Sequence, residues 1–170
     1  MLMAGQILAR AAARVFSKVL FSPSYGTARR GGFTECTVSF SNDAIASPWV
    51  SKAGTVILFE PSSLGAYEAK VQAGGTLLIE AAGLKESKTR QDIRMVTLPV
   101  VRTALDFGNS QMTNVIFLGA YTQIEKCVPQ EVIEEELERT FQAKEKALKS
   151  SLVAFREGIR LADVALGKTG

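Results

Sequence analysis

The sequence predicts an α/β fold with three layers (α/β/α), built on a Rossmann-like, mostly parallel sheet and completed by two C-terminal helices. Short apolar runs at residues 55–59, 76–79 and 94–98 are typical of strands that are buried on both faces. Segments with helical periodicity separate these runs, and two amphipathic stretches follow at 129–141 and 144–165. Strands that alternate with helices indicate a parallel sheet with helices on both faces.

The first forty residues are predicted to begin with an amphipathic helix. Leu8 and Val15 belong to an apolar stripe, while Arg10 and Arg14 repeat four residues apart on another face. Alternating polarity, interrupted by a segment rich in Pro, Ser and Gly, then predicts a short strand, a turn-rich loop and a second strand. These elements are expected at residues 3–17 (helix), 18–21 (strand), 22–32 (loop) and 34–41 (strand).

Helices are predicted between the apolar strands and after them. Pro61 suits the first turn of a helix, which the pattern extends from 61 to 71. Two more helices are expected at 99–107 and 110–124, separated by the stop signal Gly108-Asn109.

The composition indicates one globular domain over residues 1–170. This length, with 46% hydrophobic residues, supports a core without disulfide bonds. The net charge of +3 is too small to indicate nucleic-acid binding, and no run of ~20 apolar residues predicts a membrane span. Two cysteines do not make a disulfide framework, so a reducing cytoplasm is the expected compartment.

The sequence lacks the groups on which many active sites depend. It contains no histidine, and therefore no imidazole base or metal ligand, and no C-x-x-C, G-x-S-x-G or G-x-G-x-x-G motif. Gly167-Lys168-Thr169 resembles the end of a phosphate-binding loop, but Ala162 stands where that motif requires glycine. We therefore predict neither a catalytic residue nor a metal site in this chain.

The cysteines and the acidic run have structural interpretations. Cys36 lies on the apolar face of the strand 34–41 and is predicted to be a buried, inert thiol, while Cys127 has no predicted role. The acids at 134–136 are expected on a solvated helix face.

The pair Arg29-Arg30 is the best candidate for binding. It lies between glycines in the loop that follows a predicted strand, and guanidinium groups match the geometry of phosphates and carboxylates. A solvated loop is the alternative. The first 34 residues hold five basic residues and no acid, which also permits a third interpretation as an organellar import signal.

The segment 22–32 is similar to a signature, PSYG followed by RGG, of the gamma subunit of 2-oxoacid:ferredoxin oxidoreductases. Further segments resemble motifs of this family in the same order along the chain. They are 36–38 after RGG, 44–48 ("IGSP"), 74–79 ("GGxLI") and 118–120 ("LGA", preceded by Asn109 and Asn114).

The resemblance implies a subunit of an enzyme that decarboxylates a 2-oxoacid oxidatively, forms an acyl-CoA and passes electrons to ferredoxin, an iron–sulfur protein. Thiamine diphosphate with Mg²⁺, and the iron–sulfur clusters, would be held by alpha-, beta- and delta-type subunits. This chain would carry no cofactor, would be inactive alone and would contribute interface and coenzyme A contacts. The implied contact residues are Ser24, Tyr25, Gly26, Arg29, Arg30, Gly31 and Gly32.

The start of the chain departs from the family pattern. Family members open with a short strand and a glycine-rich turn, whereas here Met1 falls where the first helix begins and only Ala4-Gly5 matches. We expect a shortened reading frame or a fragment, without the anion site that such a turn forms at a helix N-terminus.

Two functional hypotheses follow. The first is the non-catalytic gamma subunit, with 2-oxoglutarate as the preferred substrate and pyruvate or branched-chain and indole pyruvates as alternatives. The second is a free-standing Rossmann-like protein that binds a nucleotide or another small molecule. The first predicts co-purification with larger subunits, and the second predicts a stable monomer that binds its ligand alone.

Overall fold

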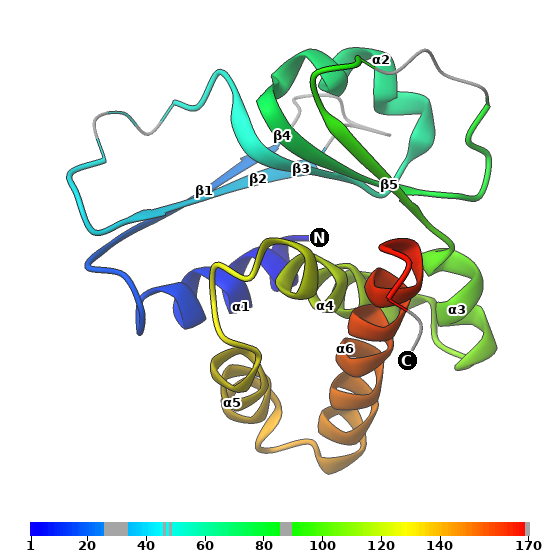
Figure 1. Ribbon diagram of the computed structural model, residues 1–170. Helices are drawn as coiled ribbons and strands as arrows, with labels where there is room; N and C mark the ends of the chain where they lie inside the picture. Colours follow the sequence, from blue (N-terminus) through cyan, green and yellow to red (C-terminus); the bar gives the residue numbers. More distant parts are fainter. Residues whose placement is uncertain (26–33, 46, 48, 86–89, 169–170) are drawn as a thin grey trace. The chain divides into compact units, whose positions relative to one another are not determined.

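The computed structural model describes residues 1–25, 34–45, 47, 49–85 and 90–168 (Figure 1). The chain forms two compact units. Unit 1 comprises Met1–Val50 and Lys126–Val153, and unit 2 comprises Ser51–Glu125 and Ala154–Gly170. The prediction of one domain over residues 1–170 stays a prediction.

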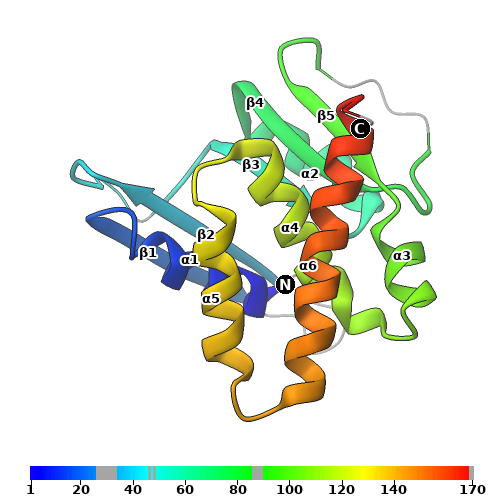
Figure 2. The ribbon, with the colours of Figure 1, turned by 60° about the horizontal axis from the view of Figure 1, so that its bottom comes forward.

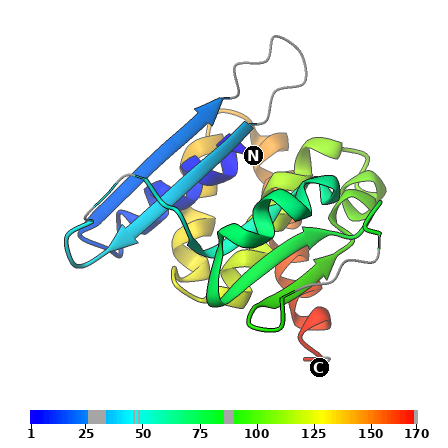
Figure 3. The ribbon, with the colours of Figure 1, turned by 90° about the horizontal axis from the view of Figure 1, so that it is seen from above.

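Unit 1 contains a two-stranded antiparallel ribbon with a helix on one face. The helix is α1 (Leu2–Ala12), and the strands are β1 (Lys18–Tyr25) and β2 (Thr34–Ser41). The register pairs Lys18 with Ser41 at one end and Tyr25 with Thr34 at the other. In Figure 3, α1 runs behind the ribbon. A two-stranded ribbon is marginally stable alone, so it needs this helix.

Gly5 lets α1 approach the ribbon closely. A Cβ atom at this position would lie 2.7 Å from Cys36 Sγ and 3.0 Å from Phe21 Cε2. Phe16, which follows α1, packs its ring on Phe40 with the centroids 4.7 Å apart. The face of β2 that carries Cys36, Val38 and Phe40 is therefore the face that α1 covers, as the alternation in the sequence predicts.

Helix α5 (Gln130–Phe141) lies beside α1 in the same unit (Figure 2). Ile133 and Leu137 are fully buried. Two ion pairs link the helices, Arg14 to Glu135 at 2.5 Å and Arg10 to Glu136 at 3.6 Å. Glu136 is only 5% exposed, so the expectation that the acids at 134–136 all lie on a solvated face is wrong at this position, where the helix turns toward the core. The Arg14–Glu135 pair is partly exposed and contributes little to stability, so we attribute the docking of α5 mainly to its apolar stripe.

Unit 2 is built on a parallel sheet of three strands in the order β3-β4-β5. The strands are β3 (Ala53–Leu58), β4 (Val71–Glu80) and β5 (Arg94–Leu98). The link from β3 to β4 consists of η1 (Pro61–Ser63), α2 (Leu64–Tyr67) and η2 (Glu68–Lys70). After β5 follow α3 (Val100–Asp106), η3 (Ser110–Met112) and α4 (Thr113–Glu125).

Helices cover both faces of this sheet. On one face, Leu77 and Ile79 of β4 form a cluster with Leu64 of α2. On the other, Phe117 of α4 meets Phe59 edge-on, with the ring centroids 4.7 Å apart. Figure 1 shows α2 and α4 on opposite sides of the three strands. The α/β class, the parallel sheet and the three layers are confirmed.

The last helix, α6 (Glu145–Ala165), crosses α4 with their backbones in contact. A Cβ atom on Gly119 of α4 would overlap the carbonyl oxygen of Phe155, and one on Gly158 of α6 would overlap that of Ile116. Figure 2 shows the two helices side by side. Only glycine at both positions permits this approach.

Several predicted boundaries are wrong, for identifiable reasons. The helix predicted at 3–17 ends at Ala12, and turns that still donate to Ala11 and Ala12 follow it. Ser17 already belongs to the base of the ribbon, where its N–H donates to Asn42 Oδ1. The helix predicted at 61–71 divides into three short turns, and Val71 already belongs to β4. The strand predicted at 18–21 continues to Tyr25, which replaces the first part of the predicted loop.

We predict that Gly119→Ala destabilises the protein by about 1–3 kcal/mol, since the added methyl group must push the backbones of α4 and α6 apart. Urea unfolding monitored by circular dichroism measures this loss. Gly65→Ala in α2 is the matched control, because a Cβ there would meet nothing within 4 Å. Equal stability of the two variants would show that α4 and α6 can move apart without loss of stability.

Candidate functional site

The predicted contact residues lie at the far end of the ribbon and in the segment that follows it. Ser24 and Tyr25 are the last two residues of β1, and their backbones pair with Glu35 and Thr34 of β2. Gly26, Arg29, Arg30, Gly31 and Gly32 lie outside the described residues. The structure therefore fixes where this segment leaves β1 and enters β2, and the contacts of these side chains stay a prediction.

Pro23, Ser24 and Tyr25 of the PSYG motif belong to a strand rather than to a loop. Pro23 pairs in register with Cys36, although proline has no N–H to donate to a ladder. Proline is tolerated because β1 has a neighbour on one side only in the part of the chain that the structure describes. The strand thus carries the motif to the tip of the ribbon, about 24 Å from its base at a rise of ~3.4 Å per residue.

The ribbon face opposite α1 is rich in small hydroxyl groups. Cys36, Val38 and Phe21 face α1. Because side chains alternate between the two faces of a strand, the opposite face carries the residues between them in each strand. Its polar members are Lys18, Ser22, Ser24, Glu35, Thr37, Ser39 and Ser41. Hydroxyl groups can both donate and accept hydrogen bonds, so this face suits a polar partner.

An open hollow of about 590 Å³ adjoins the base of the ribbon. Residues 17–20 and 44–45 line it, and Lys18 is the one charged residue among them. Ser17 in its wall donates its hydroxyl to the carbonyl oxygen of Asn42. This lining offers little to orient a ligand, so the hollow is a weaker candidate than the tip of the ribbon.

The carboxyl end of the parallel sheet is where α/β folds usually bind ligands, and here an internal carboxylate occupies it. Glu80, the last residue of the central strand, is 1% exposed. One carboxylate oxygen accepts from the N–H of Ala82 and the other from the N–H of Val101, both at 2.8 Å. Because the Glu80 side chain already accepts from both amides, they are not available to a bound phosphate.

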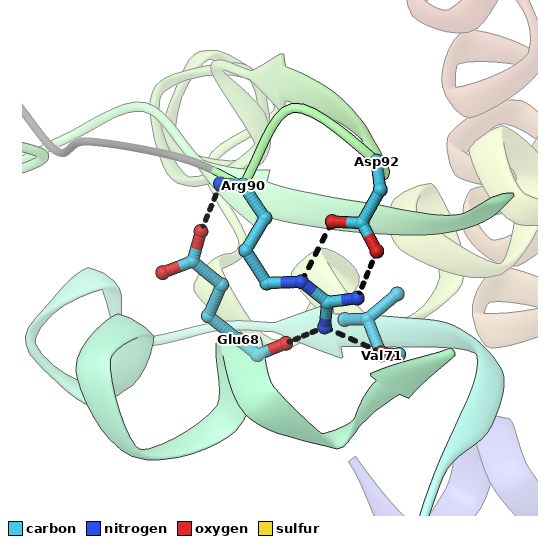
Figure 4. Close-up of polar contacts among 4 residues, drawn as sticks. All are labelled: Glu68, Val71, Arg90 and Asp92. Carbon is cyan, nitrogen blue, oxygen red and sulfur yellow. Dashed lines mark hydrogen bonds and ion pairs between the residues drawn. The ribbon is translucent and has the colours of Figure 1, made fainter. Parts of the chain in front are cut away.

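The amino end of the same sheet is held by Arg90 (Figure 4). Its guanidinium donates to both carboxylate oxygens of Asp92, at 2.8 and 2.5 Å, and to the carbonyl oxygens of Glu68 and Val71. Its backbone N–H donates to the Glu68 carboxylate at 2.6 Å. Each of these contacts is internal to the chain, so we assign Arg90 a structural role.

The thiols have different surroundings. Cys36 is half-buried beneath α1, and burial raises the pKa of its thiol, while the nearby amino terminus opposes part of this rise. Cys127 is exposed in the short segment of the chain that joins α4 to α5. The described residues include no group of three Cys, Asp or Glu side chains that could hold a metal ion.

Sequence reasoning missed the roles of Gly5, Glu80 and Arg90. Each role depends on a backbone or sulfur atom that is distant along the chain, such as Cys36 Sγ for Gly5 or the N–H of Val101 for Glu80. A lone acid at the end of an apolar strand, as in Thr76–Glu80, was the available signal for Glu80.

The fold is that of gamma subunits of oxoacid oxidoreductases. The structure matches the "keto/oxoacid ferredoxin oxidoreductase, gamma subunit" of Geobacter sulfurreducens with a TM-score of 0.80 and 22% identity, over 96% of this chain and 91% of that one. It also matches 2-oxoglutarate:ferredoxin oxidoreductase from Magnetococcus marinus, with a TM-score of 0.85 and 20% identity, over 95% of this chain and 28% of that one.

Sequence comparison gives the family. Residues 1–161 match the model described as "pyruvate ferredoxin/flavodoxin oxidoreductase", and the chain belongs to this family.

Two curated relatives differ greatly in length. The ketoisovalerate oxidoreductase subunit VorA of Methanothermobacter marburgensis is 26% identical over 155 residues, which are 91% of this chain and 32% of VorA. The 2-oxoglutarate synthase subunit KorC of Methanocaldococcus jannaschii is 29% identical over 136 residues, 78% of this chain and 73% of KorC. The chain thus spans about a third of VorA and most of KorC.

Helices long and apolar enough to cross a membrane do not occur among the residues that the structure describes.

We predict that Glu80→Gln destabilises the protein by about 1–3 kcal/mol. The amide nitrogen would face one of the two N–H donors and leave it unpaired in the core. Chemical denaturation measures the change, and Glu145→Gln on the exposed start of α6 is the control, with a change near zero. An unchanged stability of the Glu80→Gln variant would show that solvent reaches these amides.

The two thiols are expected to react at different rates with an aromatic disulfide reagent near pH 8. Cys127 should react first, because it is exposed, whereas α1 shields Cys36 and its raised pKa lowers the thiolate fraction. The single variants Cys36→Ser and Cys127→Ser assign the two phases. Equal rates in the folded protein would contradict the close packing of α1 on β2.

Asp92 should contribute to acid sensitivity. The hydrogen bonds from Arg90 lower the pKa of the Asp92 carboxyl, so its contribution to stability is present above the unfolded-state pKa of ~3.9. That contribution is lost as the pH falls through the lower folded-state value. Thermal unfolding from pH 6 to pH 2.5 should therefore show a shallower acid decline for Asp92→Asn, and identical declines would refute the linkage.

Proposed function

We propose that this chain is the non-catalytic gamma subunit of a heteromeric 2-oxoacid:ferredoxin oxidoreductase. The observation that carries the proposal is the match to the family model over residues 1–161, together with the KorC relative, which is 29% identical over 78% of this chain. The sequence adds that histidine and the C-x-x-C motif are absent, so acid–base and cluster chemistry would come from other subunits.

2-Oxoglutarate is the proposed substrate of the complex. The KorC relative, 29% identical, is a subunit of 2-oxoglutarate synthase, whereas the VorA relative belongs to a ketoisovalerate oxidoreductase. Pyruvate and branched-chain or indole pyruvates are the alternatives. Substrate choice would depend mainly on the subunits that hold the reacting carbon atoms.

The proposed partners are alpha-, beta- and delta-type subunits, with ferredoxin as an indirect partner. These subunits would hold thiamine diphosphate with Mg²⁺ and the iron–sulfur clusters, while this chain would contact coenzyme A. The family match supports such an assembly, and the cytoplasm is its proposed location.

The contact site is proposed at the tip of the ribbon. Ser24 is exposed there, and the paired backbones of Tyr25 and Thr34 hold the ends of the segment with Arg29 and Arg30. Guanidinium groups bind phosphates through paired hydrogen bonds, which suits the phosphates of coenzyme A or a carboxylate on a partner subunit.

A free-standing nucleotide-binding protein is not favoured. Such a protein would be expected to hold phosphates at the carboxyl end of the parallel sheet, where the Glu80 carboxylate already accepts hydrogen bonds from the N–H groups of Ala82 and Val101. Displacing this side chain to admit a ligand would leave two buried N–H groups to be satisfied by the ligand alone.

We predict that replacing Arg29 and Arg30 by Ala raises the KM for coenzyme A at least about 10- to 100-fold in the reconstituted complex, since the loss of one charge-assisted hydrogen bond alone costs ~1.5–3 kcal/mol. Steady-state kinetics at saturating 2-oxoglutarate gives the KM, and size-exclusion chromatography measures assembly. Arg102→Ala with Arg160→Ala is the control, because both pair only with acids on their own helices in the described structure.

The possible outcomes separate the parts of the proposal. Weakened assembly with an unchanged KM would assign the arginines to the subunit interface. If both quantities stay unchanged, the ribbon tip is not the site. If the chain fails to assemble with any thiamine-diphosphate-binding subunit, or turns over a 2-oxoacid alone, the subunit role itself is wrong.

A further inference from the structure

We draw no further inference here: the strongest candidate, the exposed apolar patch formed by Leu105 and Phe107 at the C-terminal end of α3, carries none because nothing in the structure shows what covers it.

Discussion

Direct backbone contact between α4 and α6 is the constraint on which unit 2 depends. Ile116 and Phe117 are buried within α4, which is enclosed on nearly every side. A helix that is apolar on every side must be covered by other elements on every side. Helix α6 can pack against α4 only because Gly119 and Gly158 have no side chains between the two backbones. Once α6 is seated, Phe155 is fully buried. The "LGA" segment at 118–120 therefore has a packing reason, independent of ligand binding.

The elements that local pattern alone determines were predictable. The strands at 34–41 and 94–98 were predicted with the observed bounds, because alternation or an apolar run between turn signals defines each of them locally. Tertiary structure decided the rest. Val71 was assigned to a helix by its periodicity, yet it pairs with Ala53 in the sheet. The antiparallel pairing of β1 with β2 depends on α1, which no pattern within the strands reveals.

The location of the candidate site stays a prediction, and the structure adds only the strand pairing of its first two residues, Ser24 and Tyr25. The prediction for Arg29 and Arg30 rested on their place in a glycine-flanked loop after a strand and on the match of guanidinium groups to phosphates and carboxylates. Ser24 and Tyr25 belong to a strand because they pair with Glu35 and Thr34. The sequence predicted a turn there, because proline stands at position 23. Glu80 was overlooked because its partners, the N–H groups of Ala82 and Val101, are brought to it only by the fold.

The distribution of satisfied charge favours a contact role over an independent active site. At the carboxyl end of the parallel sheet, Glu80 uses both oxygens internally, and at the amino end Arg90 uses every nitrogen of its guanidinium. Groups whose hydrogen bonds are complete gain little from a new ligand, because each new bond must replace an existing one. On the ribbon, by contrast, Ser24 is exposed, and the face opposite α1 carries further hydroxyl groups that can both donate and accept hydrogen bonds. Satisfied sheet ends and a hydroxyl-rich ribbon agree with the proposed contact role, and the match over residues 1–161 gives the family to which the chain belongs.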